Sequence, residues 1–183
     1  MAVHRVVSGG RLRVMVRVTL RAVRVDLQTN VPVLLLQELE GEGRTLPIYI
    51  GTPEATAIAY AVQGVETPRP LTHDLLADVV DVLGASIDEV VVTKLEGSTF
   101  YAELRLGTPS GTKVVSARPS DAVALAIRTD APLYVDDEVM EACGLLLPED
   151  ELADEDLDEE LEEEVVEEFK EFLDTIRPED FSG

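Results

Sequence analysis

The sequence predicts an α+β protein with a mixed, largely antiparallel β-sheet, about four packed helices and a C-terminal amphipathic acidic helix. Three observations predict this class. Segments rich in Val, Leu and Ile are separated by short turns that contain glycine, a pattern typical of neighbouring antiparallel strands. Several other segments open with proline and an acidic residue, which suit the first turn of a helix. After Pro148 the composition changes abruptly to Asp and Glu.

The first half of the chain predicts a meander of three strands followed by a helix. The turn Glu40–Gly43 contains two glycines, which permit the positive φ angles of a tight hairpin. A helix is expected over Pro53–Gln63, because Thr52 can cap it, Pro53 suits the first helical position and Gly64 ends it. The expected strands are Ala22–Gln28, Val31–Glu38 and Thr45–Ile50.

The second half predicts three more helices and four more strands. From Thr72 to Gly84 the apolar residues recur at helical spacing, at Leu75, Leu76, Val79, Val80 and Leu83. Pro119 opens a third helix that extends to Arg128, and a fourth is expected near Asp136–Ala142. The expected strands are Ile87–Leu95, Phe100–Leu106, Lys113–Ser116 and Leu133–Val135.

Charge divides the chain into three parts. Residues 1–22 are predicted to form an Arg-rich N-terminal arm or strand, residues 23–147 the compact domain, and residues 148–183 an acidic helical tail. The tail holds eighteen acids against Lys170 and Arg177, a net charge of −16, whereas residues 1–24 hold six arginines and no acid. The net charge of −22 therefore leaves −12 for residues 25–147, which weighs against nucleic-acid binding through a basic surface.

The tail keeps an apolar stripe at a spacing of three to four residues, which predicts one amphipathic helix that docks on the domain, a second subunit or a protein partner. Its eighteen acids also raise the hypothesis that it mimics nucleic acid and suppresses activity. The alternative for the tail is a solubilising extension. The residues that form the stripe are Leu157, Leu161, Val165, Phe169, Phe172 and Ile176.

Composition also indicates the cellular setting. The single cysteine, Cys143, cannot form an internal disulfide, and no apolar run approaches the roughly 20 residues that cross a bilayer. We therefore expect a soluble cytoplasmic protein without a membrane segment. Motifs for zinc peptidases, P-loop nucleotide hydrolases and dinucleotide enzymes are absent from the sequence.

Several motifs, taken together, resemble the bifunctional nuclease family. They cover roughly 120 residues in unbroken order, and Ser116–Ala122 before an Ala-rich helix is the most distinctive of them. The acidic C-terminal extension resembles actinobacterial members. The matching segments are Pro32–Leu36, Leu46–Gly51, Glu54–Ala55, Pro70–Leu75, Thr99–Glu103, Ser116–Ala122, Pro132–Val135, Glu138–Val139 and Cys143–Gly144.

The resemblance implies a nuclease that degrades DNA and RNA with low sequence specificity, acts as a homo-oligomer and needs Mg²⁺ or Mn²⁺. Phosphodiester hydrolysis generally needs carboxylates to hold the metal, a base to activate water and a cation to stabilise the developing charge. The rival reading is a non-catalytic binding or regulatory module that engages a protein partner through the acidic tail.

Two polar clusters supply candidate catalytic residues, namely His73 with Asp74, and Arg118 with Ser120 and Asp121. His73 is a candidate general base or metal ligand, or else the donor of a cap hydrogen bond. Arg118 precedes a helix, where a cation opposes the helix dipole, so it predicts either a phosphate contact or an ion pair with a buried acid.

The candidate metal ligands are Glu54, Asp74 and Asp121. Each lies at the start of an expected helix, where an acid also stabilises the helix dipole without touching any ligand. Glu138 begins the fourth expected helix in the same way. Both interpretations therefore remain open for these four carboxylates.

Overall fold

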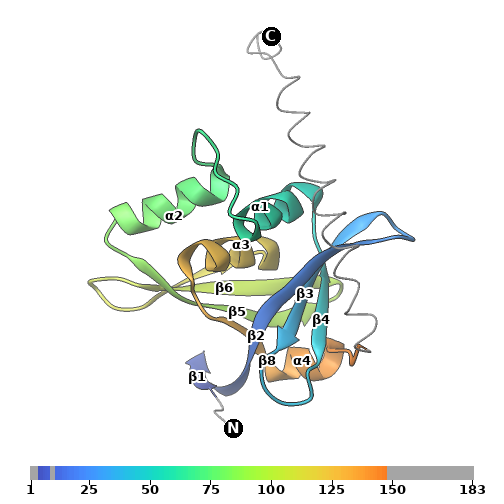
Figure 1. Cartoon of the computed structure of the whole chain (residues 1–183). Helices are drawn as coiled ribbons and strands as arrows, with labels where there is room; N and C mark the ends of the chain where they lie inside the picture. Colours follow the sequence, from blue (N-terminus) through green and yellow to red (C-terminus); the bar gives the residue numbers. More distant parts are fainter. Residues whose placement is uncertain (1–3, 9–10, 148–183) are drawn as a thin grey trace.

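The computed structural model describes residues 4–8 and 11–147, so the helix expected in the acidic tail lies outside the described residues. An eight-stranded sheet forms the framework of the described part (Figure 1), in the order β4-β3-β2-β8-β5-β6-β7, with β1 paired to β2. Strands β5 and β8 are parallel, and the other pairs are antiparallel. The prediction of a mixed, largely antiparallel sheet with four helices is confirmed. The strands are β1 (His4–Ser8), β2 (Arg11–Asp26), β3 (Val31–Glu38), β4 (Thr45–Tyr49), β5 (Ser86–Glu96), β6 (Thr99–Gly107), β7 (Lys113–Ala117) and β8 (Leu133–Asp136).

The Arg-rich N-terminal segment is a strand rather than a disordered arm from Arg11 onward. Strand β2 pairs with β3 along Val18–Asp26 and with β8 along Met15–Val18, so it joins the two halves of the sheet. Met15 and Val18 are each 3% exposed. The sheet and its core therefore begin before Val23.

Three helices lie together on one side of the sheet (Figure 1), and α4 lies away from them at the far end of the domain. Helix α3 contacts both α1 and α2 as well as strands β5 and β6. Its residues Ala122–Ala126 are buried, and their three alanines allow the neighbouring helices to approach closely. The buried residues of the main core cluster are aliphatic, in keeping with an aromatic content of only 4%. The helices are α1 (Thr52–Val62), α2 (Thr72–Val82), α3 (Pro119–Thr129) and α4 (Asp137–Cys143).

Helix α2 begins and ends close to its predicted limits, but most of its apolar surface faces solvent. Ala77 and Val80 pack against the core. By contrast, none of its described residues is fully buried, although the helix is apolar on several faces. The large apolar side chains exposed on or directly after this helix are Leu75, Leu76, Val79, Val82 and Leu83.

Because the apolar contacts of α2 are few, its position depends strongly on Arg128, in the last turn of α3. The Arg128 Nε atom donates to Asp74 of α2 at 2.5 Å, and Nη2 donates to the backbone carbonyl of Ala57 in α1 at 3.0 Å. Nη1 donates to the carbonyl of Ala124 in α3 at 2.9 Å. The Arg128 side chain is only 9% exposed, so water cannot replace these partners easily. One side chain thus connects all three helices.

Replacing Arg128 by methionine should lower the free energy of unfolding by about 2–4 kcal/mol, because Asp74 and the Ala57 carbonyl lose their charged donor. Urea denaturation at neutral pH measures this change. Lys113→Ala, at an exposed position of β7, is the control and should change stability by less than about 0.5 kcal/mol. Equal stability of Arg128→Met and the unaltered chain would show that Arg128 does not hold the helices.

Candidate active site

A pocket of about 510 Å³ lies where α1, α2 and α3 begin. The partial positive charge of a helix is concentrated at its N-terminal end, so this pocket receives that charge from three helices. Such a position suits an anion. Its lining residues come from α1 (Pro53, Glu54, Thr56, Ala57), from the start of α2 and the preceding loop (Pro70, Leu71, Thr72, His73) and from the start of α3 (Arg118, Asp121).

Arg118 occupies the N-cap position of α3 and is held by two acids. Its Nε donates to Asp121 Oδ2 at 2.7 Å, and its Nη2 donates to Asp121 Oδ1 at 3.0 Å and to Glu54 Oε1 at 2.8 Å. These hydrogen bonds, first those to Asp121 and then the one to Glu54, raise the pKa of Arg118. The Arg118 side chain is 65% exposed, and its Nη1 makes no hydrogen bond or ion pair within the part of the chain that the structure describes. Two N–H donors of Nη1 therefore remain for a ligand.

Gly51 makes the position of Glu54 possible. Gly51, rather than Thr52, is the N-cap residue of α1, and the Glu54 carboxylate folds back over it. A Cβ atom at residue 51 would collide with Glu54 Oε2. The absence of a side chain at Gly51 thus allows Glu54 to reach Arg118.

His73, in the first turn of α2, connects this cluster to the second helix. Its Nε2 lies 3.1 Å from Asp121 Oδ1, and its side chain is 12% exposed. Burial alone would raise the pKa of Asp121, but hydrogen bonds from Arg118 and His73 outweigh burial and lower it. Asp121 is therefore ionised at neutral pH and favours the His73 tautomer with a proton on Nε2, which leaves a lone pair on Nδ1.

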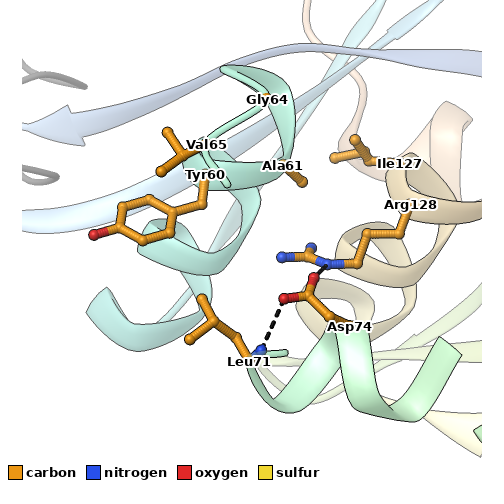
Figure 2. Close-up of a pocket in the computed structure, with 8 residues that line it drawn as sticks. All are labelled: Tyr60, Ala61, Gly64, Val65, Leu71, Asp74, Ile127 and Arg128. Atoms are coloured by element: carbon orange, nitrogen blue, oxygen red, sulfur yellow. Dashed lines mark hydrogen bonds and ion pairs between the residues drawn. The ribbon is translucent and has the colours of Figure 1, made fainter. Parts of the chain in front are cut away.

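The Asp74 side chain points away from this cluster and toward Arg128. Figure 2 shows its carboxylate facing Arg128, beside a separate pocket of about 250 Å³. Its Oδ2 also accepts the backbone N–H of Leu71 at 2.8 Å, which caps the start of α2. Leu71 is the N-cap residue of α2. Asp74 and its sequence neighbour His73 therefore belong to two different side-chain clusters.

Two further candidate site residues lie apart from the cluster around Arg118. Ser120 is 5% exposed, and the lining of the larger pocket does not include it. Glu138 lies in the first turn of α4, where its backbone N–H donates to Asp136 Oδ1 at 3.1 Å. The structure therefore brings together Glu54, His73, Arg118 and Asp121 but not Asp74, Ser120 or Glu138.

The arrangement does not fit a divalent metal as it stands. Among the described residues, no group of three or more His, Cys, Asp or Glu side chains is placed to hold a metal ion. Glu54 and Asp121 both direct carboxylate oxygens at the Arg118 guanidinium, and Asp74 is paired with Arg128. Mg²⁺ and Mn²⁺ need several free oxygen ligands. The three predicted metal ligands therefore do not form one site.

The fold and pocket define a class of protein, an α+β domain with a small polar pocket at the start of three helices. A family model described as "Bifunctional nuclease domain" matches residues 34–147, and the chain belongs to this family. The family prediction made from the sequence is confirmed.

The relatives extend this result. An uncharacterized protein of Mycobacterium tuberculosis H37Rv is 48% identical over 159 residues, covering 87% of this chain and 93% of that protein, which fits the predicted actinobacterial form. Bifunctional nuclease 1 of Arabidopsis thaliana is 27% identical, covering 64% of this chain and 37% of that protein. Bifunctional nuclease 2 of the same plant is 30% identical, covering 56% and 32%. This chain thus spans only about a third of the two plant nucleases.

Within the described residues, no helix is long and apolar enough to span a membrane.

The Asp74–Arg128 pair predicts a pH dependence of stability. Burial alone would raise the pKa of Asp74, but hydrogen bonds from Arg128 and Leu71 outweigh burial, so its folded pKa lies below the ordinary 3.8. A depressed carboxyl pKa stabilises the fold above the unfolded pKa, and this contribution is lost as pH falls through the folded value. Asp74→Asn should therefore be less stable at pH 7 by about 1–2 kcal/mol.

This difference between Asp74→Asn and the unaltered chain should stay constant from pH 7 to about 5 and shrink below the unfolded pKa. Urea denaturation of both proteins across this range measures it. A difference that grows on acidification would contradict the assignment of Asp74.

Proposed function

We propose that the chain hydrolyses phosphodiester bonds of DNA and RNA at the pocket where α1, α2 and α3 begin. One observation carries the proposal: the Arg118 guanidinium is fixed by Glu54 and Asp121 while its Nη1 remains available at an open pocket. A fixed cation with a free N–H edge suits a phosphate oxygen. Membership of the bifunctional nuclease domain family supports a nuclease, and the names of the plant relatives agree with it.

In this proposal Arg118 provides electrostatic stabilisation. Negative charge grows on the phosphoryl oxygens in the transition state, and donors that are already oriented cost no reorganisation at that moment. The ion pairs with Glu54 and Asp121 orient Arg118, and the N-terminal ends of three helices add a field of the same sign. Glu54 and Asp121 are positioning residues here.

His73 is the proposed general base. Its Nε2–H donates to Asp121, which leaves Nδ1 to accept a proton from the attacking water. The proton moves from water to Nδ1 as the new oxygen–phosphorus bond forms. The bond from phosphorus to the leaving sugar oxygen breaks, and that oxygen takes a proton from solvent water. Asp121 stabilises the resulting imidazolium, because its carboxylate stays ionised. Asp121 thus orients the Arg118 cation and also stabilises the protonated form of the His73 base.

The lining also supports low sequence specificity. Its described residues include no Phe, Tyr or Trp side chain on which a base could stack, and its charged groups suit phosphate rather than base edges. Contacts to the backbone carry no sequence information directly. The proposed substrate is therefore the sugar–phosphate backbone of either nucleic acid.

Assistance by Mg²⁺ or Mn²⁺, a homo-oligomer, a protein partner for the tail and a cytoplasmic location stay predictions, and no proposed step depends on them.

Arg118→Ala should lower the turnover of single-stranded DNA and RNA by the full-length protein about 10²–10³-fold, because the transition-state charge loses its oriented donor. His73→Ala should lower it about 10²–10⁴-fold, and added imidazole should restore part of the rate by replacing the base. Nuclease assays on identically purified variants measure both effects. Lys113→Ala is the matched control, since this exposed cation lies on β7 and is not among the pocket-lining residues.

A contaminating nuclease would leave the same activity in all preparations. Unchanged rates in both Arg118→Ala and His73→Ala, relative to Lys113→Ala, would remove this pocket from consideration.

A further inference from the structure

We infer that Arg69 is a second phosphate contact of the pocket and binds the phosphate next to the one held by Arg118. This inference rests on the proposed function and describes the substrate more closely, as a chain that presents two consecutive phosphates. Within a DNA or RNA strand, each phosphate has such a neighbour along the backbone. A second cation beside the pocket therefore suits a strand better than a single phosphate ester.

Arg69 lies next to the pocket, in the loop that joins α1 to α2. The residue directly after it, Pro70, lines the pocket, and so do Leu71 and Thr72. Consecutive Cα atoms are about 3.8 Å apart, so the backbone of Arg69 is adjacent to the pocket lining. Arg69 is also exposed, and a ligand in the pocket can therefore approach it from the solvent.

Local contacts restrict the backbone on both sides of Arg69. Pro68 and Pro70 flank it, and a proline fixes its own φ angle and limits the residue before it to extended conformations. The hydroxyl of Thr67 donates to the Arg69 carbonyl at 2.7 Å. A backbone that is already restricted loses little entropy when its side chain binds a ligand.

Charge distinguishes Arg69 from most other cations of the domain. Residues 25–147 hold nineteen acids and only seven Lys or Arg residues. Within the described residues, Arg69 and Lys113 make no ion pair or side-chain hydrogen bond, although acids are in large excess. The guanidinium of Arg69 therefore keeps its N–H donors for a ligand. The five cations that do pair with acids are Arg44, Lys94, Arg105, Arg118 and Arg128.

A second phosphate needs a cation of its own at this pocket. Glu54 and Asp121 already place two negative charges against the single positive charge of Arg118. Residues 25–147 carry a net charge of −12, so a phosphate that follows the bound one meets a repulsive field. Arg69 offsets this repulsion where the loop before α2 borders the pocket.

Thymidine 3′,5′-bisphosphate tests the inference, because its two phosphates are consecutive along a nucleic-acid strand. Thymidine 5′-monophosphate and thymidine 3′-monophosphate are the single-phosphate references. Isothermal titration calorimetry at low salt measures the binding of each compound to the full-length protein. Arg69→Gln removes the charge, and Lys113→Gln is the matched control, because Lys113 is the other cation without an acid partner among the described residues 25–147 and lies on β7, outside the pocket lining.

Arg69→Gln should weaken binding of the bisphosphate about fivefold, as expected for an exposed ion pair, and binding of each monophosphate by less than about twofold. Lys113→Gln should leave all three affinities unchanged. An equal loss for the bisphosphate and the monophosphates in Arg69→Gln would overturn the inference, because a purely structural role predicts that result. No loss in Arg69→Gln, or no binding of the bisphosphate to the unaltered chain, would also overturn it.

This experiment separates the inference from the proposed function. Binding is observed without turnover, so a loss confined to the bisphosphate would support the second contact even in a chain that hydrolyses no nucleic acid. Conversely, a nuclease that depends on Arg118 and His73 but binds the bisphosphate equally well with Arg69→Gln would keep the proposed function and reject only the second contact.

Discussion

The buried Arg128 side chain is the interaction on which the arrangement of the helices depends. It donates to a carboxylate of α2 and to backbone carbonyls of α1 and α3. Helix α2 has no fully buried described residue, so apolar burial alone would hold it weakly. Because Arg128 fixes the first turn of α2 against α3 through Asp74, the neighbouring His73 lies within reach of Asp121 in the first turn of α3. The geometry of the pocket thus follows from a contact outside it.

The two arginines of α3 have different physical roles. Arg128 lies in the last turn, where the helix dipole favours a cation, and it is almost completely buried. Arg118 lies at the N-cap, where the dipole opposes a cation, and Glu54 and Asp121 compensate for that cost. A cation kept at an unfavourable but exposed position is available to a ligand. The same contacts give this cation its fixed orientation.

Local patterns predicted most of the fold, because turns, helix starts and strand alternation depend on neighbouring residues. The limits of α1 and α3 were predicted to within about one residue, and an ion pair of Arg118 with an acid was one of two stated alternatives. Sequence could not show that Asp74 turns to Arg128 while His73 turns to Asp121, since both partners lie about fifty residues away. Sequence patterns did not reveal that Arg128 connects three helices, because a cation in the last turn of a helix looks like an ordinary dipole-stabilising residue. Sequence patterns also did not reveal that Gly51 makes room for the Glu54 carboxylate.

The central claim is that Arg118 Nη1 contacts a phosphate of the nucleic-acid backbone. A crystal structure of the full chain with thymidine 3′,5′-bisphosphate tests it most directly. The account predicts a phosphate oxygen within about 3.2 Å of Nη1, with the bonds from Arg118 to Asp121 retained. A nucleotide bound at the N-terminal arginines, with none in the pocket at the start of α1, α2 and α3, would contradict it.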